Sequence, residues 1–122
     1  MKKFTFKKTK IKGLYLIKPK IFKDYRGVFF RYFCSDEYKN IIFKNKILQT
    51  NICTNVKKGT LRGLHYQNKP HEETKIVTCV SGEIYDVAVD LRKNSKTFMK
   101  YFGTKLSEKN KHILYIPNGF AH

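Results

Sequence analysis

The sequence predicts a single all-β domain, folded as a sandwich or barrel of short strands. The chain has 122 residues, which is enough for one hydrophobic core and too few for two. Hydrophobic residues make up 41% of it and aromatic residues 15%, so their burial can offset the conformational entropy lost on folding. Short segments rich in branched and aromatic residues alternate with polar turns, a pattern typical of strands. We therefore expect residues 1–122 to form one β-rich domain.

Seven segments have this strand pattern, and one has the pattern of a short helix. The expected strands are residues 14–18, 28–33, 48–55, 61–67, 76–80, 83–91 and 112–116. The polar cluster 23–27 connects the first two, and residues 117–119 form a sharp turn after the last. Ser35 is followed by two acidic residues and so suits a helix N-terminus, which places the one expected helix near residues 35–44.

The chain contains no repeat or linker that would divide it, and its apolar runs are far shorter than the roughly 20 residues of a membrane-spanning helix. Lysines throughout residues 2–12 are incompatible with an export signal, so we expect a cytoplasmic protein. The cysteines Cys34, Cys53 and Cys79 lack C-x-x-C spacing and suit buried thiols in a reducing compartment. Because the chain stops directly after a turn, we expect it to be truncated.

The formal net charge is +17, from 26 basic and 9 acidic residues, which raises the possibility of nucleic-acid binding. Of the basic residues 22 are lysines and only 4 are arginines, whereas phosphate and base recognition favours the bidentate guanidinium. We interpret the lysines as solvated surface charge, and a basic nucleic-acid-binding barrel stays a distant alternative.

Chemically useful residues concentrate between positions 49 and 75. If residues 61–67 form a strand, alternation places His65 and Gly63 on one face, where the glycine leaves room for a ligand near the backbone. Gln49 and Asn51 share a face of the preceding expected strand and offer amides to hydroxyls or a base. Lys75, expected to face the same cavity, would stabilise an oxyanion beside the imidazole.

Each of these residues also has a simpler interpretation. A lone strand histidine is often a hydrogen-bonded core residue, and Arg62 and Lys75 taken alone are ordinary surface charges. Asp86 and Asp90 alternate with apolar residues and are either polar lining or the solvated side of a strand. The spacing of Gly59, His65 and Gln67 resembles the start of a metal-binding cupin motif, but the second histidine is missing, so no metal is expected.

Six motifs together resemble one family, the dTDP-4-dehydrorhamnose 3,5-epimerases. The order and spacing match along essentially the whole chain, in D-Y-R-G-V-F (24–29), Q-T-N (49–51), L-R-G-L-H-Y-Q (61–67), K-I-V (75–77), G-E-I-Y-D-V-A-V-D-L-R (82–92) and I-P-N-G-F-A-H (116–122). The resemblance implies a cupin-like jelly roll, also called a double-stranded β-helix, that needs no metal or redox cofactor. It also implies a homodimer with exchanged N-terminal strands.

The resemblance further implies a substrate and a set of site residues. The substrate would be a dTDP-linked 4-keto-6-deoxyhexose, converted from dTDP-4-dehydro-6-deoxyglucose to dTDP-4-dehydrorhamnose for lipopolysaccharide or related surface polysaccharides. His65 matches the general base of the family. The positions that match substrate-binding residues are Arg26, Gln49, Asn51, Arg62, Lys75 and His122.

Two departures from the family pattern bear on activity. Arg31 stands where the family has glutamate, which questions the nucleotide contact. The family also continues beyond the segment that ends here at His122, so the jelly roll is expected to be incomplete at its C-terminus, without the proton-returning tyrosine. Weak activity is therefore expected. A catalytically inactive cupin that binds a nucleotide sugar or a partner subunit, and a sugar-nucleotide ketoisomerase, stay open as alternatives.

Overall fold

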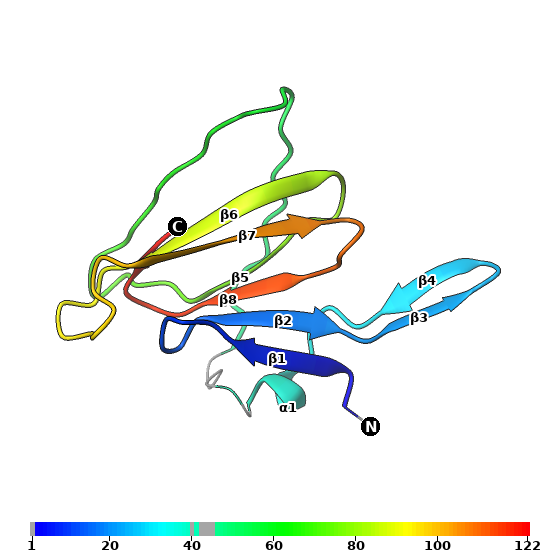
Figure 1. Ribbon diagram of the computed structural model, residues 1–122, viewed down its shortest axis with the longest axis horizontal. Coiled ribbons are helices and arrows are strands. Elements are labelled where there is room, and N and C mark those ends of the chain that lie inside the picture. The colour runs from blue at the N-terminus through cyan, green and yellow to red at the C-terminus, as the bar shows by residue number, and fades with distance from the viewer. Residues whose placement is uncertain (1, 40, 42–45) are drawn as a thin grey trace.

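Two β-sheets, a separate hairpin and a short helix make up the protein (Figure 1). The computed structural model describes residues 2–39, 41 and 46–122. The elements are β1 (Phe4–Lys8), β2 (Tyr15–Pro19), β3 (Ile21–Asp24), β4 (Gly27–Phe30), α1 (Ser35–Tyr38), β5 (Lys75–Thr78), β6 (Glu83–Asp90), β7 (Tyr101–Ser107), β8 (Ile113–Ile116) and β9 (Phe120–Ala121). The all-β prediction is thereby confirmed.

The two sheets are antiparallel, with strand orders β1-β2-β8-β5 and β7-β6-β9. Strands β3 and β4 pair only with each other and form a hairpin that projects from the sheets at the right of Figure 1. Between β4 and β5 the chain forms a long excursion at the top of the figure. We call residues 46–74 the arm. No helix among the described residues is long and apolar enough to cross a membrane.

Strand β8 is buried on both faces. Its residues Ile113–Ile116 are between 0 and 2% exposed. Leu114 and Ile116 belong to a core that includes Ala88 and Leu106 of the second sheet. Ile113 and Tyr115 belong to a second core, which contains the buried Tyr38 of α1. A strand that is buried on both faces has a continuous run of apolar residues in its sequence instead of an apolar–polar alternation. Residues 113–116 have such a run.

Helix α1 is short and owes its position to aromatic packing. The ring of Tyr38 lies 5.3 Å from that of Phe4 at an angle of 89°, and 4.8 Å from that of Phe33. The side chain of Glu37 accepts a hydrogen bond of 2.9 Å from the main-chain N–H of Lys3, which ties the helix to β1. The expected helix over 35–44 is confirmed for its first four residues. Residues 39 and 41 form a turn instead, and positions 40 and 42–44 lie outside the described residues.

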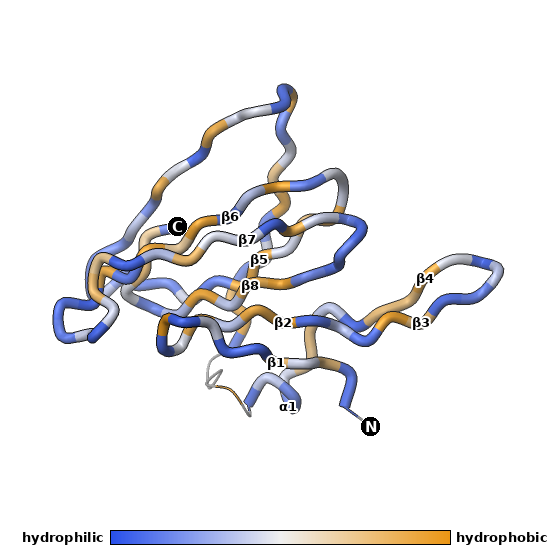
Figure 2. The backbone as a smooth tube through the Cα atoms, viewed as in Figure 1, coloured by the Kyte–Doolittle hydropathy of each residue, from blue (hydrophilic) through white to orange (hydrophobic). Residues whose placement is uncertain are grey.

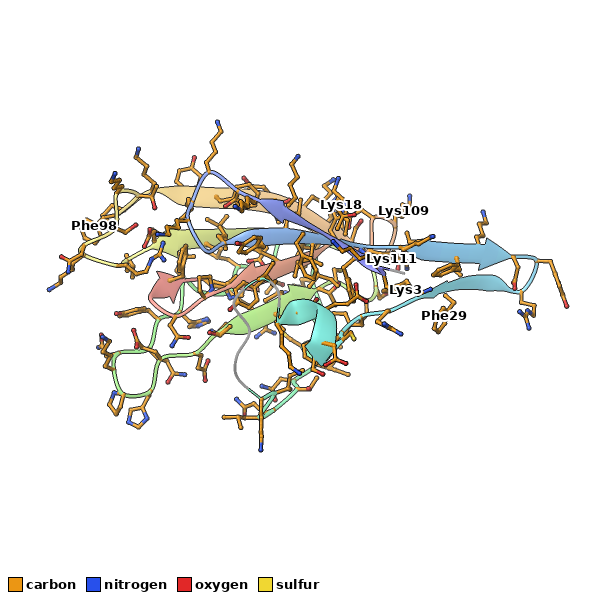
Figure 3. The ribbon with its side chains drawn as sticks, turned by 90° about the horizontal axis from the view of Figure 1, so that it is seen from below. Lys3, Lys18, Phe29, Phe98, Lys109 and Lys111 are labelled. Carbon is orange, nitrogen blue, oxygen red and sulfur yellow. The ribbon has the colours of Figure 1, made fainter. Side chains whose placement is uncertain are left out.

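Lysines lie above aromatic rings of the hairpin that β3 and β4 form. The ammonium group of Lys3 lies 4.5 Å from the ring centroid of Phe22, and that of Lys111 lies 5.5 Å from that of Phe30. Each contact of this kind contributes about 0.5–1 kcal/mol at an exposed site. Figure 3 shows lysine side chains extending outward from the sheets, with Lys3 and Lys111 close to the base of the hairpin.

Four expected strands, 14–18, 76–80, 83–91 and 112–116, correspond to β2, β5, β6 and β8, and 28–33 corresponds to the shorter β4. The expected strands at 48–55 and 61–67 are wrong. Both segments lie in the arm, where every residue from 46 to 71 is exposed and none belongs to a strand. Branched and aromatic residues favour a strand only where another strand supplies hydrogen bonds, and the arm has almost none within the described chain. Figure 2 shows apolar and polar residues interspersed along it.

Burial also corrects two smaller expectations. Cys79 is buried and Cys34 half-buried, but Cys53 lies in the arm and is exposed. Asp86 and Asp90 are both buried, so neither lies on a solvated side of β6. Their positions alternate with Ile84 and Ala88 because β6 is a regular strand in which even-numbered residues face the interior.

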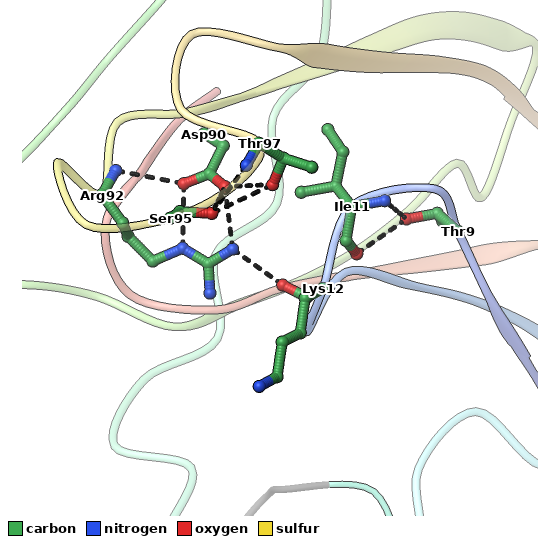
Figure 4. A network of polar contacts seen from close by, with 7 residues as sticks. All are labelled: Thr9, Ile11, Lys12, Asp90, Arg92, Ser95 and Thr97. Atoms are coloured by element: carbon green, nitrogen blue, oxygen red, sulfur yellow. Dashed lines mark hydrogen bonds and ion pairs between the residues drawn. The ribbon is translucent and has the colours of Figure 1, made fainter.

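Asp90 organises a polar network where β6 ends (Figure 4). Its two carboxylate oxygens accept hydrogen bonds from the guanidinium of Arg92 at 2.8 and 2.9 Å, and from the hydroxyls of Ser95 and Thr97 at 2.6 Å each. Arg92 also donates a 2.8 Å hydrogen bond to the carbonyl of Lys12. Burial pushes the pKa of Asp90 upward, but these hydrogen bonds outweigh burial and hold the pKa well below its usual range.

Replacing this carboxylate provides a test of its contribution to stability. Because the folded pKa of Asp90 lies below the unfolded value, its ionised form adds stability that is fully present above about pH 4 and is lost as the pH falls through the folded pKa. We expect Asp90→Asn to lower the free energy of unfolding by about 3 kcal/mol at pH 7 and to flatten its decline below pH 4. Urea unfolding at a series of pH values measures both effects.

Glu83→Gln is the matched control, because Glu83 also lies on β6 but its ion pair with Lys105 is exposed. This substitution should cost less than about 1 kcal/mol and leave the acid slope unchanged. Equal losses in the two variants would contradict the role assigned to Asp90.

Candidate active site

Two histidines join the arm to the second sheet. The main-chain N–H of His65 donates to the carbonyl of His122 at 2.7 Å, and the N–H of His122 donates to the carbonyl of His65 at 3.0 Å. This reciprocal pair has the pattern of an antiparallel bridge. Since β9 pairs with β6 through Phe120 and Ala121, His122 continues the same edge of the sheet and places His65 beside it.

Gly63 allows this close approach. Its φ of +91° is a conformation that residues with a Cβ adopt only with strain. A Cβ at this position would also lie 2.9 Å from the carbonyl oxygen of His122. The sequence suggested that this glycine leaves room for a ligand, but the structure places the main chain of His122 there instead.

His65 and Lys75 line the same small pocket. Its lining residues are His65, Tyr66, Gln67, Glu73, Lys75, Gly119 and Phe120. The three elements that meet are the arm, the start of β5 and the turn before β9. The cavity holds only about 10 Å³, roughly the space of one water molecule. The cavity is therefore too small to enclose any ligand larger than a water molecule. The strict alternation expected for residues 61–67 is wrong, because Tyr66 lines the pocket together with both of its neighbours.

The charges at this pocket are partly neutralised. The ammonium nitrogen of Lys75 lies 3.6 Å from a carboxylate oxygen of Glu73, and both side chains are about one-third exposed, at 32% and 38%. An ion pair of this length and exposure is weak, worth about 1 kcal/mol or less. Lys75 therefore keeps donors that can reach an oxygen of a bound ligand, since an ammonium group offers three N–H bonds.

A buried carboxylate holds the imidazole of His122. Asp86 on β6 places Oδ1 at 2.6 Å from Nε2 of His122, and its side chain is 4% exposed. The sequence left the role of Asp86 open between polar lining and a solvated position. The available signal was its alternation with Ile84 and Ala88, which predicts an inward side chain once β6 is known to be a strand.

Arg26 lies far from this pocket. It is at the tip of the β3–β4 hairpin, which projects from the end of the molecule opposite the C-terminus (Figure 1). Its guanidinium contacts Asp24 at 2.7 Å, and the hydrogen bonds from Arg26 lower the pKa of that carboxyl. The hairpin borders an open hollow of about 260 Å³, lined by residues that include Phe22, Val28 and Arg26. Within a single chain, Arg26 and His65 are thus not brought together.

Gln49, Asn51 and Arg62 also lie outside the lining of the pocket, on exposed stretches of the arm. The guanidinium of Arg62 donates to the side-chain oxygen of Asn55 at 2.7 Å and to the carbonyl of Thr54 at 3.3 Å, so it connects the two branches of the arm. Arg31, the departure from the family pattern, pairs with Glu37 of α1 at 3.2 Å.

The described residues include no group of three His, Cys, Asp or Glu side chains placed to hold a metal ion. The acid–base groups in the lining of the pocket are the imidazole of His65, the ammonium group of Lys75, the carboxylate of Glu73 and the phenol of Tyr66. An imidazole beside a cation suits proton abstraction next to a group that develops negative charge. Fold and pocket together define a β protein of two sheets with a candidate acid–base site at the edge of the second sheet.

Comparison with known proteins gives the family. The family model for dTDP-4-dehydrorhamnose 3,5-epimerase matches residues 8–122. The enzyme of that name from Shigella flexneri is 45% identical over 116 residues, and the one from Methanothermobacter thermautotrophicus is 42% identical over 123 residues. The chain belongs to the dTDP-4-dehydrorhamnose 3,5-epimerase family.

Solved structures agree. The crystal structure of the Sulfolobus tokodaii dTDP-4-dehydrorhamnose 3,5-epimerase superimposes with a TM-score of 0.91 at 45% identity and covers 99% of this chain. A Legionella pneumophila dTDP-6-deoxy-D-glucose-3,5-epimerase in complex with dTDP-4-keto-L-rhamnose gives a TM-score of 0.90 at 40% identity and covers 98%. The predicted cupin-like jelly roll is thereby confirmed.

The match covers only part of each relative. The alignments span 94% of this chain but 64% of the Shigella protein, and 100% of this chain but 65% of the Methanothermobacter protein. The corresponding shares of the Sulfolobus and Legionella chains are 67% and 63%. The chain thus spans slightly less than two thirds of the length of these two curated relatives.

Two glycines of the arm provide a matched test of the His65–His122 bridge. Gly63 and Gly59 both have positive φ, but only Gly63 would place a Cβ against other atoms. We expect Gly59→Ala to cost about 1–2 kcal/mol of backbone strain, and Gly63→Ala to break the bridge as well. Amide hydrogen exchange measures this directly, because the His65 N–H should lose protection only in Gly63→Ala. Equal protection in both variants would contradict the close packing of Gly63 against His122.

Proposed function

We propose that the chain carries the epimerase chemistry of its family, acting on a dTDP-linked 4-keto-6-deoxyhexose. The observation that supports this most directly is the shared pocket of His65 and Lys75. A C4 carbonyl acidifies the protons at C3 and C5, because the carbanion that forms on their removal is delocalised as an enolate. Removing such a proton from one face of the ring and returning one to the other face inverts the centre. This chemistry requires no redox step.

In this proposal His65 is the general base. Histidine is the side chain that most often transfers protons in enzymes. Lys75 stabilises the negative charge that develops on the C4 oxygen. The main chain of His122 is hydrogen-bonded to that of His65. In the proposal, His122 binds the sugar from its position beside His65 on the sheet edge.

The remaining proposed contacts go to the nucleotide. Arg62 suits the diphosphate, since a guanidinium binds phosphate oxygens with two parallel hydrogen bonds. Gln49 and Asn51 lie exposed on the arm, where their amides can reach a base or hydroxyls. Among the relatives, a Bacillus anthracis dTDP-4-dehydrorhamnose 3,5-epimerase has TDP and PPi bound, which supports a nucleotide diphosphate ligand.

Arg26 fits the proposal only if a second subunit supplies it, because its hairpin projects away from its own chain. We propose a homodimer in which the N-terminal strands are exchanged and Arg26 of one subunit approaches the site of the other. The exposed Phe29 and Val28 of the hairpin support this, since they present apolar surface for a partner. We propose neither a nucleic acid nor a membrane as a partner of this chain.

Sedimentation at micromolar concentration tests the dimer. The expected species has twice the 14.5 kDa mass of the chain, and Phe29→Ser should shift it towards the monomer by removing apolar contact area from the hairpin. Phe98→Ser serves as the control, because Phe98 is also an exposed aromatic residue but lies at the end of the molecule opposite the hairpin (Figure 3). A wild-type chain that sediments as a monomer at all concentrations would contradict the exchanged dimer.

We further place the reaction in the cytoplasm, in the supply of dTDP-rhamnose or a related precursor for lipopolysaccharide or another surface polysaccharide. A second candidate function is binding of the nucleotide sugar without turnover. The small cavity favours it, because it leaves little room for a sugar carbonyl oxygen to approach the ammonium group of Lys75.

Solvent deuterium exchange separates these two functions. In D₂O, an active chain introduces deuterium at C3 and C5 of dTDP-4-keto-6-deoxyglucose, which mass spectrometry and NMR detect, whereas a binder introduces none. We expect His65→Ala to lower the exchange rate by about 10²–10⁴-fold, the usual contribution of a general base.

His71→Ala is the matched control, because His71 is an exposed arm histidine outside the lining of the pocket. The His71→Ala variant should introduce deuterium into the sugar at the wild-type rate. Wild-type exchange in His65→Ala would refute the assigned base. Nucleotide binding with no exchange in the wild-type chain would favour the second function.

A further inference from the structure

Asp86 is the one buried side chain of the described residues that retains an oxygen without a hydrogen-bond partner. The residue is 5% exposed, its Oδ1 contacts His122, and its Oδ2 is unpartnered. Removing a carboxylate from water is costly unless another group compensates it by hydrogen bonding or charge. The 2.6 Å contact with Nε2 of His122 is therefore the interaction that compensates the burial of Asp86.

His122 is consequently fixed at two points. Asp86 holds its side chain from the interior of β6, and the two hydrogen bonds to His65 hold its main chain at the sheet edge. A quarter of the His122 side chain stays exposed. Because Nε2 is occupied by Asp86, the ring nitrogen left for any ligand is Nδ1.

A carboxylate acceptor determines which imidazole nitrogen carries the proton. An ionised carboxylate only accepts hydrogen bonds, so Nε2 of His122 must donate, and a neutral ring then leaves Nδ1 as an acceptor. The same arrangement orients the histidines of hydrolase triads and of metal sites, where the carboxylate acts through the ring and never touches the substrate.

We propose that Asp86 is a positioning residue of the candidate site. It fixes the rotamer of His122 and its Nε2–H tautomer, so that Nδ1 is presented as an acceptor for a hydroxyl of the sugar; this last clause rests on the proposed function. Through the main-chain bridge, the same contact also limits the movement of His65. One buried carboxylate thereby connects the interior of the second sheet to both histidines.

Histidine nitrogen NMR of the uniformly ¹⁵N-labelled chain tests the tautomer. Long-range ¹H–¹⁵N correlations distinguish a protonated from an unprotonated ring nitrogen. In the wild-type chain we expect the proton of neutral His122 on Nε2. In Asp86→Asn, the amide of the new side chain can donate to Nε2, so the proton should move to Nδ1. A role in packing alone would not reverse the tautomer, because aspartate and asparagine have nearly the same shape.

A second measurement tests the main-chain hydrogen bonds between His65 and His122. The amide of His65 should exchange on the order of tenfold faster in Asp86→Asn, since loss of the side-chain contact favours local opening of the sheet edge. Asp36→Asn is the control, because it removes the same charge from an exposed position whose partner is Lys39. It should change neither the tautomer of His122 nor the exchange of His65.

Two results would overturn the inference. One is a wild-type His122 with its neutral proton on Nδ1, which needs no variant and decides the matter even if Asp86→Asn does not fold. The other is an Asp86→Asn spectrum and His65 exchange rate identical to wild type. Neither readout uses a substrate, so failure of the proposed function, seen as absent deuterium exchange, is distinct from failure of this inference.

Discussion

Strand β8 is the element on which both cores depend, because its four residues are buried on both faces. Leu114 and Ile116 pack towards the second sheet, and Ile113 and Tyr115 pack towards α1. Such a strand tolerates only one register, since a shift by one residue would exchange the residues of the two cores. Its pairing with β5 sets Lys75 opposite Ile116. The chain that leaves β8 then turns through residues 117–119 and delivers His122 to the edge of the second sheet. The pocket is thus a consequence of how β8 is buried.

A polar network stabilises the same corner of the molecule. The guanidinium of Arg92 is oriented by Asp90, lies 4.7 Å from the ring of Phe120, and donates to the carbonyl of Lys12. The N–H of Leu91 donates to the carbonyl of Gly119 at 2.9 Å, within the turn that precedes β9. Two buried carboxylates of β6 therefore have distinct tasks. Asp90 fixes the turn and its surrounding loops, whereas Asp86 contacts His122 directly.

Most strands of the two central sheets can be predicted from the sequence. The strands and contacts that cannot be predicted depend on interactions between distant parts of the chain. Apolar runs and regular alternation identify β8 and β6, because burial on both faces or on one face imposes those patterns. Two lysines in β1, and a glycine and one lysine in β7, interrupt the pattern, so only the strands with which they pair reveal them. The arm has strand-like composition, but composition does not supply hydrogen-bond partners, and its expected strands were wrong. The role of Asp86 could not be predicted, because it depends on a contact with His122. That residue lies 36 positions further along the chain, and the sequence alone does not show that the two side chains meet.

The central claim is that His65 and Lys75 act together on the carbon atoms beside a sugar carbonyl. A crystal structure of the chain with a bound dTDP-linked 6-deoxyhexose tests it most directly. The account predicts the His65 imidazole at about 3–3.5 Å from the substituents of C3 or C5, the separation of reacting groups held ready for reaction, with the Lys75 ammonium group within hydrogen-bond distance of the oxygen on C4. A sugar bound elsewhere, or one whose C4 oxygen faces away from Lys75, would contradict it.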